Sequence, residues 1–192
     1  MAELLELGKN ARDVKYVLQQ LATEEKNIAL QTAAKYLCDR QEEILAANER
    51  DLESGRKNGM NPGLLDRLKL TAERIAQIAE GLNQIAALPD CIGETIEHFE
   101  RPNGLKIDKV RVPLGVIGII YEARPNVTAD AFGLCFKTGN AVILKGGSDA
   151  IHSNIAIVKV LQDALEACRL PRTAVQLIED TDRAVTAQFM KM

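Results

Sequence analysis

The chain has 192 residues, of which 46% are hydrophobic and 27% charged, and its formal net charge is −3. This composition is typical of a globular protein that is long enough to bury a core, and it lacks the excess of basic residues that a nucleic-acid surface needs. No run of about 18 apolar residues predicts a membrane span, and the acidic start of the chain is unlike a secretory leader.

The four cysteines are scattered along the chain and show no metal-binding spacing. We therefore expect no metal site, and we interpret the cysteines as reduced thiols of a cytoplasmic protein. Cys135 lies among Phe132, Leu134 and Phe136, a setting that favours an inert core thiol over a nucleophile. His98 and His152 are the only histidines, and neither has an evident partner for acid–base catalysis.

The first ninety residues are predicted to form helices. Apolar residues at alternating steps of three and four form one stripe of a first helix: Leu4, Leu7, Ala11, Val14, Leu18 and Leu21. Thr23 is expected to cap a second helix, with Glu24 and Glu25 in its first turn. One side of that helix is expected to carry Ile28, Ala33, Ala34 and Leu37.

Glycine, proline and threonine mark the limits of the next helices. A third helix carries Ile44, Leu45 and Leu52 and is expected to end at Gly55 and Gly59. Pro62 fits the first turn of a short helix. Thr71 is expected to cap a further helix, whose apolar positions are Ile75, Ile78, Ala79, Leu82 and Ile85.

The pattern changes after Pro89. Residues 95–101 and 105–112 are rich in β-branched side chains and flank the turn signal Pro102-Asn103-Gly104, which predicts a β-hairpin. The alternation slips near Asp108 and Lys109, which indicates a bulge there.

From Gly115 onward, strands alternate with helices, which predicts a parallel sheet with right-handed crossovers. The first strand, residues 115–120, is uniformly apolar, as expected for a strand buried on both faces. The predicted elements that follow are a helix over 128–137 stopped by Gly139, a strand over 141–144, a helix over 149–168, a strand over 174–178 and a helix from Asp182. Three strands make a thin sheet, so we expect this domain to be incomplete.

The first candidate for chemistry is Arg124-Pro125-Asn126, just after a strand. Ligands of open α/β sheets bind beyond the carboxyl ends of the strands. The Asn126 amide could donate to a developing oxyanion, and it could equally be a turn residue or an N-cap. Arg124 could help to bind an anionic substrate, or it could form a surface ion pair.

The second candidate is Lys145-Gly146-Gly147-Ser148, directly after the next strand. Its glycines allow a backbone to approach a ligand, and the following helix points its N-terminus at the same region. Lys145 and Ser148 could hydrogen-bond a nucleotide ribose or its phosphate. A plain strand-to-helix turn explains the pattern equally well, and neither a Rossmann GxGxxG nor a Walker loop is present.

Two segments carry a resemblance to a known family. Residues 113–118 and 138–145 resemble the aldehyde dehydrogenase superfamily, and Leu170-Pro171 before a strand fits its next crossover. Residues 121–128 and 144–154, together with the turn at 101–105, are similar to the γ-glutamyl phosphate reductase family. The resemblance spans nearly the whole chain.

The resemblance implies NADPH-dependent reduction of L-glutamyl 5-phosphate to L-glutamate 5-semialdehyde and phosphate, a step of proline biosynthesis. In that family a cysteine thiolate displaces phosphate to give a thioester, which hydride then reduces. Asn126 matches the asparagine that holds the oxyanion, and Lys145 matches the lysine that contacts the adenosine ribose. A glutamate is common at the position of Ser148 in NAD-preferring members, so Ser148 favours NADP(H), because a carboxylate would repel a 2′-phosphate.

The family's catalytic cysteine and the glycine-rich segment near the nicotinamide lie outside this sequence. We therefore expect residues 1–90 to be the helical part of a cofactor-binding domain and residues 113–192 its incomplete Rossmann-like part. The hairpin, residues 91–112, is the expected oligomerisation arm of a homo-oligomer. The resemblance is to the single-function enzyme, with a functional association with glutamate 5-kinase. The alternative is an inactive nucleotide-binding or oligomerising fragment of the superfamily.

Overall fold

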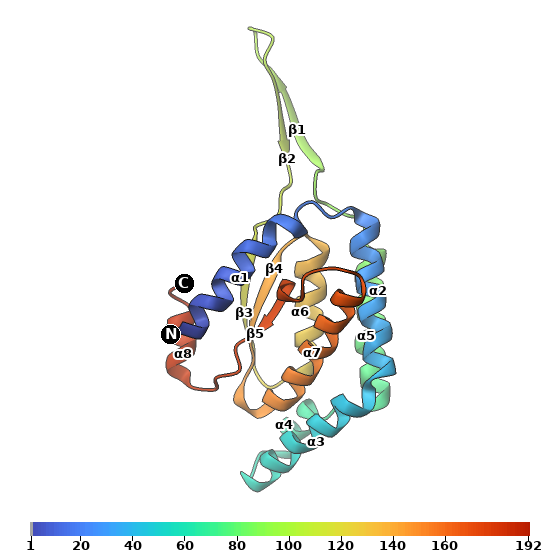
Figure 1. Ribbon diagram of the computed structural model, residues 1–192, viewed down its shortest axis with the longest axis vertical. Helices are drawn as coiled ribbons and strands as arrows, with labels where there is room; N and C mark the ends of the chain where they lie inside the picture. The colour runs from blue at the N-terminus through green and yellow to red at the C-terminus, as the bar shows by residue number, and fades with distance from the viewer. Residues whose placement is uncertain (1) are drawn as a thin grey trace.

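The computed structural model describes residues 2–192 (Figure 1). Five helices come first, then a two-stranded hairpin, then strands that alternate with helices. The N-terminal helices are α1 (Ala2–Leu18), α2 (Thr23–Asp39), α3 (Gln41–Lys57), α4 (Pro62–Leu68) and α5 (Ala72–Ala87). The remaining elements are β1 (Thr95–Glu100), β2 (Lys106–Val110), β3 (Val116–Ile120), α6 (Pro125–Lys137), β4 (Ala141–Lys145), η1 (Ser148–Ala150), α7 (Ile151–Ala167), η2 (Arg172–Ala174), β5 (Val175–Leu177) and α8 (Arg183–Phe189).

The apolar stripe of α1 is confirmed, because its members are buried or pack against the core. Two details of α2 were predicted wrongly. The N-cap is Ala22 rather than Thr23, and the Glu25 carboxylate accepts a hydrogen bond from the Ala22 N–H at 2.8 Å. Ile28 is 48% exposed. It lies two residues before the buried Leu30, so it points to the opposite side of the helix.

Of the two glycines predicted to end α3, one does so and the other does not. Gly55 lies inside the helix, where it is buried. A Cβ at this position would come within 3.0 Å of Leu65 and 3.3 Å of Met60, so the glycine allows α4 to approach closely. Gly59, at a φ of +69°, follows the end of the helix as predicted.

The predicted starts of α4 and α5 are confirmed. Pro62 is the first residue of α4, and the Asn61 side chain accepts a hydrogen bond from the Gly63 N–H at 2.8 Å. Thr71 caps α5 through the N–H of Arg74. This start of α5 is important for the site described below.

Strands β1 and β2 form an antiparallel hairpin that projects from the rest of the molecule (Figure 1). Every residue of both strands is exposed. The predicted bulge exists, but it lies on β1: the register shifts between Thr95 and Glu97, which pair with Val110 and Lys109. The extra residue is therefore Ile96, and the position in β2 near Asp108 was wrong.

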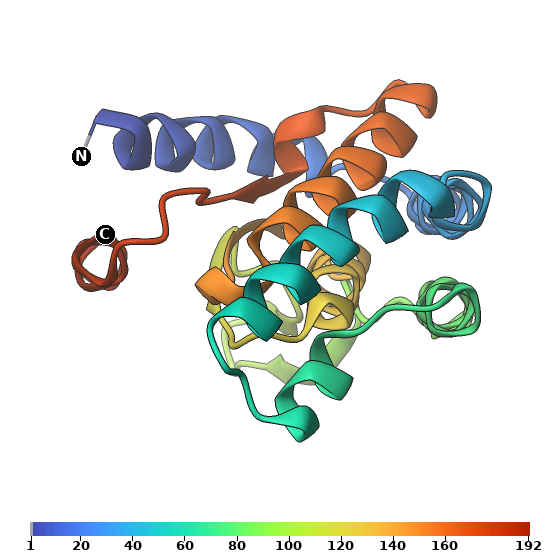
Figure 2. The same ribbon diagram turned by 90° about the horizontal axis from the view of Figure 1, so that it is seen from below.

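Strands β3, β4 and β5 form the predicted parallel sheet, with β4 in the centre. Helices α6 and α7 cover one face, and α1 and α8 lie on the other (Figure 2). Two helices of the N-terminal part, α2 and α5, pack outside α6 and α7. One hydrophobic core therefore runs from α1 through the sheet to α5. The division at residues 90 and 112 stays a prediction.

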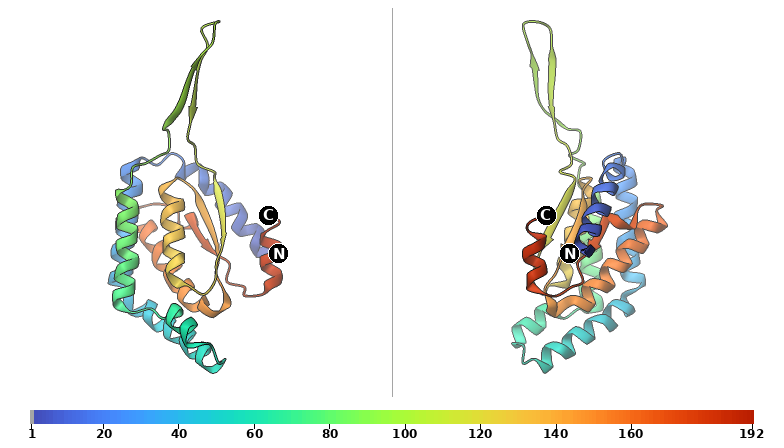
Figure 3. Two further views of the ribbon diagram at one scale, coloured as in Figure 1. Left: turned by 180° about the vertical axis from the view of Figure 1, so that it is seen from behind. Right: turned by 60° about the vertical axis from the view of Figure 1, so that its left-hand side comes forward.

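Burial of β3 on both faces was wrong. Val116, Gly118 and Ile120 are exposed, whereas every residue of β4 is buried. The physical reason is that β3 is an edge strand whose face is only partly covered. Helix α8 lies beside it (Figure 3), with the Phe189 ring 2.7 Å from a Cβ built on Gly118.

Helix α6 begins three residues earlier than predicted, at Pro125, and ends before Gly139, which adopts a φ of +72°. Proline suits a first turn because its missing N–H needs no partner there. The loop after β3 is therefore short, and Asn126 lies in the first turn of α6. Among residues 2–192, no helix is long and apolar enough to cross a bilayer.

Candidate functional site

The two candidate loops leave the sheet side by side. The last residues of β3 and β4, Ile120 and Lys145, are partners in the parallel register. The Tyr121 N–H then donates to the Lys145 carbonyl at 3.1 Å. The pairing of adjacent parallel strands therefore places both loops at the carboxyl edge of the sheet, where ligands of such folds bind.

Lys145 is a buried cation that is nearly without partners. The residue is 4% exposed, and its ammonium donates a hydrogen bond to the Gly146 carbonyl at 3.3 Å. An ammonium has three N–H donors, and no other acceptor for them appears in the described part of the chain. A ribose hydroxyl or another oxygen ligand would satisfy the remaining donors, so this residue fits the predicted nucleotide contact.

The two glycines of the second loop lie where larger residues do not fit. A Cβ on Gly146 would be 2.2 Å from the Asn154 amide nitrogen and 3.2 Å from the Tyr121 ring. A Cβ on Gly147 would be 3.3 Å from the backbone at Glu122 and Ala123. These close approaches hold the second loop against the first, so the glycines have a packing role in addition to any approach to a ligand.

A chain of polar side chains lies beneath the two loops. The Tyr121 and Thr128 hydroxyls are 2.7 Å apart, and Thr128 donates to the Asn154 carbonyl oxygen at 2.9 Å. Burial raises the pKa of Tyr121 to about 12, so this hydroxyl keeps its proton at neutral pH. The Asn154 amide nitrogen is buried and has no acceptor among the described residues. Tyr121, Thr128 and Asn154 lie in segments that resemble the reductase family, and no local pattern in the sequence predicts this chain of hydrogen bonds.

The N-terminus of α7 is already occupied. The Asp51 carboxylate, from α3, accepts hydrogen bonds from the His152 N–H at 3.1 Å and the Ser153 N–H at 2.8 Å. It also accepts from the Ser153 hydroxyl at 2.6 Å. A buried carboxylate of the protein therefore holds two of the first N–H groups of this helix, and a contribution of the helix N-terminus to ligand binding stays a prediction. Ser148 begins η1 and is exposed, so its hydroxyl is available to a ligand.

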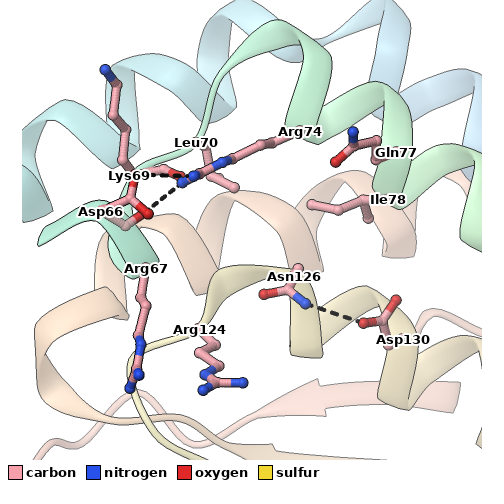
Figure 4. A pocket seen from close by; sticks show the side chains of 10 residues that line it. All are labelled: Asp66, Arg67, Lys69, Leu70, Arg74, Gln77, Ile78, Arg124, Asn126 and Asp130. Atoms are coloured by element: carbon pink, nitrogen blue, oxygen red, sulfur yellow. Dashed lines mark hydrogen bonds and ion pairs between the residues drawn. The ribbon is translucent and has the colours of Figure 1, made fainter. Parts of the chain in front are cut away.

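Arg124 and Asn126 line one pocket of about 440 Å³ between the start of α6 and the α4–α5 corner (Figure 4). Arg124 is the N-cap residue of α6, which excludes a capping role for Asn126. The Asn126 amide nitrogen donates to the Asp130 carboxylate at 3.3 Å, a long hydrogen bond that a better acceptor can replace. Burial raises the pKa of Asp130. Sequence reasoning missed the opposite wall of this pocket, which carries Arg67.

Cys135 and His98 lie away from these loops. All four cysteines are free, and burial raises the pKa of the Cys135 thiol to about 11, which agrees with an inert core thiol. His98 lies in the hairpin, where its Nδ1 is 2.6 Å from the Asp108 carboxylate. No group of three or more His, Cys, Asp or Glu side chains within residues 2–192 is placed to hold a metal ion.

Comparisons with known proteins give a consistent result. The model of the aldehyde dehydrogenase family matches residues 2–192. The γ-glutamyl phosphate reductase of Geobacillus thermodenitrificans is 55% identical over 190 residues, which is 99% of this chain and 46% of that protein. The enzyme of the same name from Heliobacterium modesticaldum is 56% identical over 191 residues and is covered to the same 46%. The chain thus spans about half the length of the curated relatives that it matches.

Solved structures similar to this chain agree with the sequence comparisons. The γ-glutamyl phosphate reductase of Thermotoga maritima superposes with a TM-score of 0.96 at 43% identity, over 98% of this chain and 45% of that one. The Saccharomyces cerevisiae protein of that name gives 0.87 at 27% identity, over 98% of this chain and 54% of that one. A probable aldehyde dehydrogenase from Listeria monocytogenes, at 16% identity and a TM-score of 0.72, shares the fold. The chain belongs to the aldehyde dehydrogenase family and is similar within it to the N-terminal half of γ-glutamyl phosphate reductases.

Proposed function

We propose that this chain is the cofactor-binding half of an enzyme that reduces L-glutamyl 5-phosphate to L-glutamate 5-semialdehyde and phosphate with NADPH, in proline biosynthesis. The observation that carries the proposal is the pairing of Ile120 with Lys145, which brings the loop that leads to Asn126 and the side chain of Lys145 to one edge of the sheet. The names of the relatives that the chain matches over its whole length support the substrate and the reaction.

The chain's own residues have three tasks in this proposal. The Lys145 ammonium binds the adenosine ribose with the donors that the protein leaves free. The Asn126 amide donates to the oxyanion that develops at the acyl carbon of the substrate, and the bond to this oxyanion replaces its long bond to Asp130. Arg124, which lines the same pocket, binds an anionic group of the substrate. The nicotinamide, when bound, supplies the hydride.

Family membership implies a nicotinamide cofactor, and Ser148 supports the choice of NADPH over NADH. Its exposed hydroxyl can donate to a 2′-phosphate. We expect Ser148→Glu to weaken NADPH binding about tenfold or more through charge repulsion, and to spare NADH. Ser148→Ala is the matched control, because it removes the hydroxyl without adding charge. Fluorescence titration of both nucleotides measures the effect, and an unchanged preference in the glutamate variant would contradict this assignment.

The nucleophilic cysteine of the reaction is expected outside these residues. We therefore expect the purified 192-residue chain to bind NADPH and to show no reduction of glutamyl phosphate. Addition of the complementary half of a relative should restore NADPH oxidation, and Lys145→Ala should abolish both binding and restored activity. Reduction by the chain alone would contradict the missing nucleophile. A chain that binds no NADPH would instead favour the alternative of an oligomerising fragment.

Three further properties belong to the proposal. We place the enzyme in the cytoplasm, with its substrate supplied by glutamate 5-kinase. We also propose that the projecting hairpin joins two or more copies of the chain, because all of its strand residues are exposed, apolar ones included.

A further inference from the structure

The pocket that contains Asn126 is strongly basic on its opposite wall. It is lined by four cationic side chains and two acidic ones: Arg67, Lys69, Arg74, Arg124, Asp66 and Asp130. The wall facing α6 is the corner between α4 and α5, a segment that sequence reasoning treated only as a helix boundary (Figure 4).

Arg74 is committed to the corner. Its guanidinium forms an ion pair with the Asp66 carboxylate at 3.0 Å and donates to the backbone carbonyls of Asp66 and Lys69, the latter at 2.7 Å. These bonds use three of its five N–H donors, and the ion pair neutralises Asp66. Arg74 therefore shapes the wall and contributes little net charge to the pocket.

Arg67 and Arg124 are not committed. Arg67 comes from α4, and Arg124 is the residue before α6. Within residues 2–192, neither guanidinium has a carboxylate or carbonyl partner. Both side chains extend toward the same end of the pocket, away from Arg74 (Figure 4). Two guanidinium groups directed into one space repel each other unless an anion lies between them. Each also presents a planar set of donors that matches a carboxylate or a phosphate.

The remaining acid does not cancel this charge. The Asp130 carboxylate lies farther along α6, next to the Asn126 amide (Figure 4). Burial, the main cause, raises the pKa of Asp130, so its environment disfavours a further negative charge at that end. The pocket thus has a neutral donor and a carboxyl group at one end and two free guanidinium groups at the other.

We propose that Arg67 is a substrate-binding residue, which together with Arg124 holds an anionic group of the substrate while Asn126 contacts the acyl oxygen. This inference rests on the proposed function and adds to it a binding residue from the α4–α5 corner. An acyl phosphate of an acidic amino acid carries both a carboxylate and a phosphate, and a guanidinium pair accepts either group. The corner therefore selects substrates that carry a second anion.

The test is isothermal titration calorimetry, in which the 192-residue chain is titrated with inorganic phosphate and, separately, with glutarate at constant ionic strength. We expect one of these anions to bind, and its identity tells which group the pair holds. Arg67→Gln should weaken that binding about tenfold, and Arg67→Lys should recover part of it. Arg183→Gln, which removes an exposed arginine of α8 that lies outside the pocket, is the matched control.

The outcomes separate this inference from the proposed function. If neither anion binds, or if Arg67→Gln binds as well as the unsubstituted chain, the role of Arg67 is refuted. NADPH titration of the same proteins should be unaffected by Arg67→Gln. Intact NADPH binding without anion binding overturns only the inference, whereas anion binding without NADPH binding overturns the cofactor assignment. Because Arg67 is exposed, its variants should unfold at the same denaturant concentration as the unsubstituted chain.

Discussion

Gly146 connects the packing of the site to its function. The Asn154 amide lies 2.2 Å from the place of a Cβ, and Asn154 in turn accepts the hydrogen bond of the buried Thr128. A methyl group here would push apart the two loops that carry Lys145 and Asn126. The need for glycine at this position therefore comes from the protein interior, whether or not a ligand is bound.

We expect Gly146→Ala to destabilise the protein by about 1–3 kcal/mol, the usual cost of overpacking a rigid interior. Urea unfolding measures the change. The matched control is Gly81→Ala in α5, where the nearest atom to the new Cβ is 3.7 Å away. This control should gain about 0.5–1 kcal/mol, because alanine favours a helix. Equal effects of the two substitutions would contradict the steric argument.

The Cys135 thiol provides a pH-dependent prediction. Its pKa is raised to about 11, so at pH 8 only about one thousandth of it is thiolate, and this fraction grows as the pH rises toward 11. Iodoacetamide at pH 8 should therefore alkylate the exposed Cys38 and leave Cys135 unmodified in the folded chain. Mass spectrometry of the peptides checks this. Rapid modification of Cys135 would show a reactive thiol where the structure has an inert one.

The sequence predicted the site residues unevenly. Residues at or shortly after the end of a strand, such as Lys145 and Asn126, could be proposed because strand ends can be located from apolar runs. Asp51 and Arg67 were missed, since each lies opposite a segment that is far away in the chain, and neither carries a local pattern. Long-range contacts of polar side chains depend on how helices pack, and periodicity does not contain that information.

At the scale of elements, α7 depends on a cap from another helix. Asp51 is 2% exposed, and its carboxylate accepts three hydrogen bonds at the start of α7. Because α3 supplies this cap, the helical part of the chain fixes the position of the helix that follows the Lys145 loop. A change in the packing of α3 would therefore alter the position of the loop that carries Lys145.

We expect Asp51→Ala to destabilise the protein by about 2 kcal/mol or more, since it leaves buried donors of α7 unpaired. Asp51→Asn should lose less, because an amide oxygen can still accept a hydrogen bond. Asp149→Ala, at an exposed position in the neighbouring η1, should change stability by less than about 0.5 kcal/mol. Thermal unfolding followed by circular dichroism distinguishes the three variants, and an Asp51→Ala protein as stable as the Asp149→Ala protein would refute the capping role.

Most elements could be predicted because their signals are local. The apolar stripe of α1, Pro62 at the start of α4 and the parallel direction of β3, β4 and β5 all follow from spacing or from strand–helix alternation. Three of the errors share a physical origin. The exposure of Ile28 and of β3, and the burial of Gly55, depend on which neighbour covers each surface, and this is a property of the assembled fold.

At the scale of the whole molecule, the hairpin is the part without a core. One of its faces carries the cross-strand pair Phe99 and Ile107, beside an ion pair between Glu97 and Lys109. The other face carries His98 opposite Asp108. An isolated two-stranded ribbon is only marginally stable in water, and an apolar pair on one face favours contact with a second copy.

We expect the chain to self-associate through this face, and the double substitution Phe99→Ser with Ile107→Ser to shift the molar mass toward that of a monomer. Light scattering at several protein concentrations measures the change. Substitution of His98 and Asp108 by serine, on the opposite face, is the control and should leave the mass unchanged. A monomeric parent chain would contradict the oligomerisation arm.

The position of the hairpin has a consequence for chain connectivity. Residues 102–104 form its tip, far from the core that joins α2 and α5 to α6 and α7 (Figure 1). A break between Asn103 and Gly104 would leave every core contact in place, because the helices before the hairpin and the sheet after it hold each other by packing. The two pieces, expressed separately, should thus reassemble. A circular permutant, in which the original ends are joined and the new ends lie at this tip, should have the same fold.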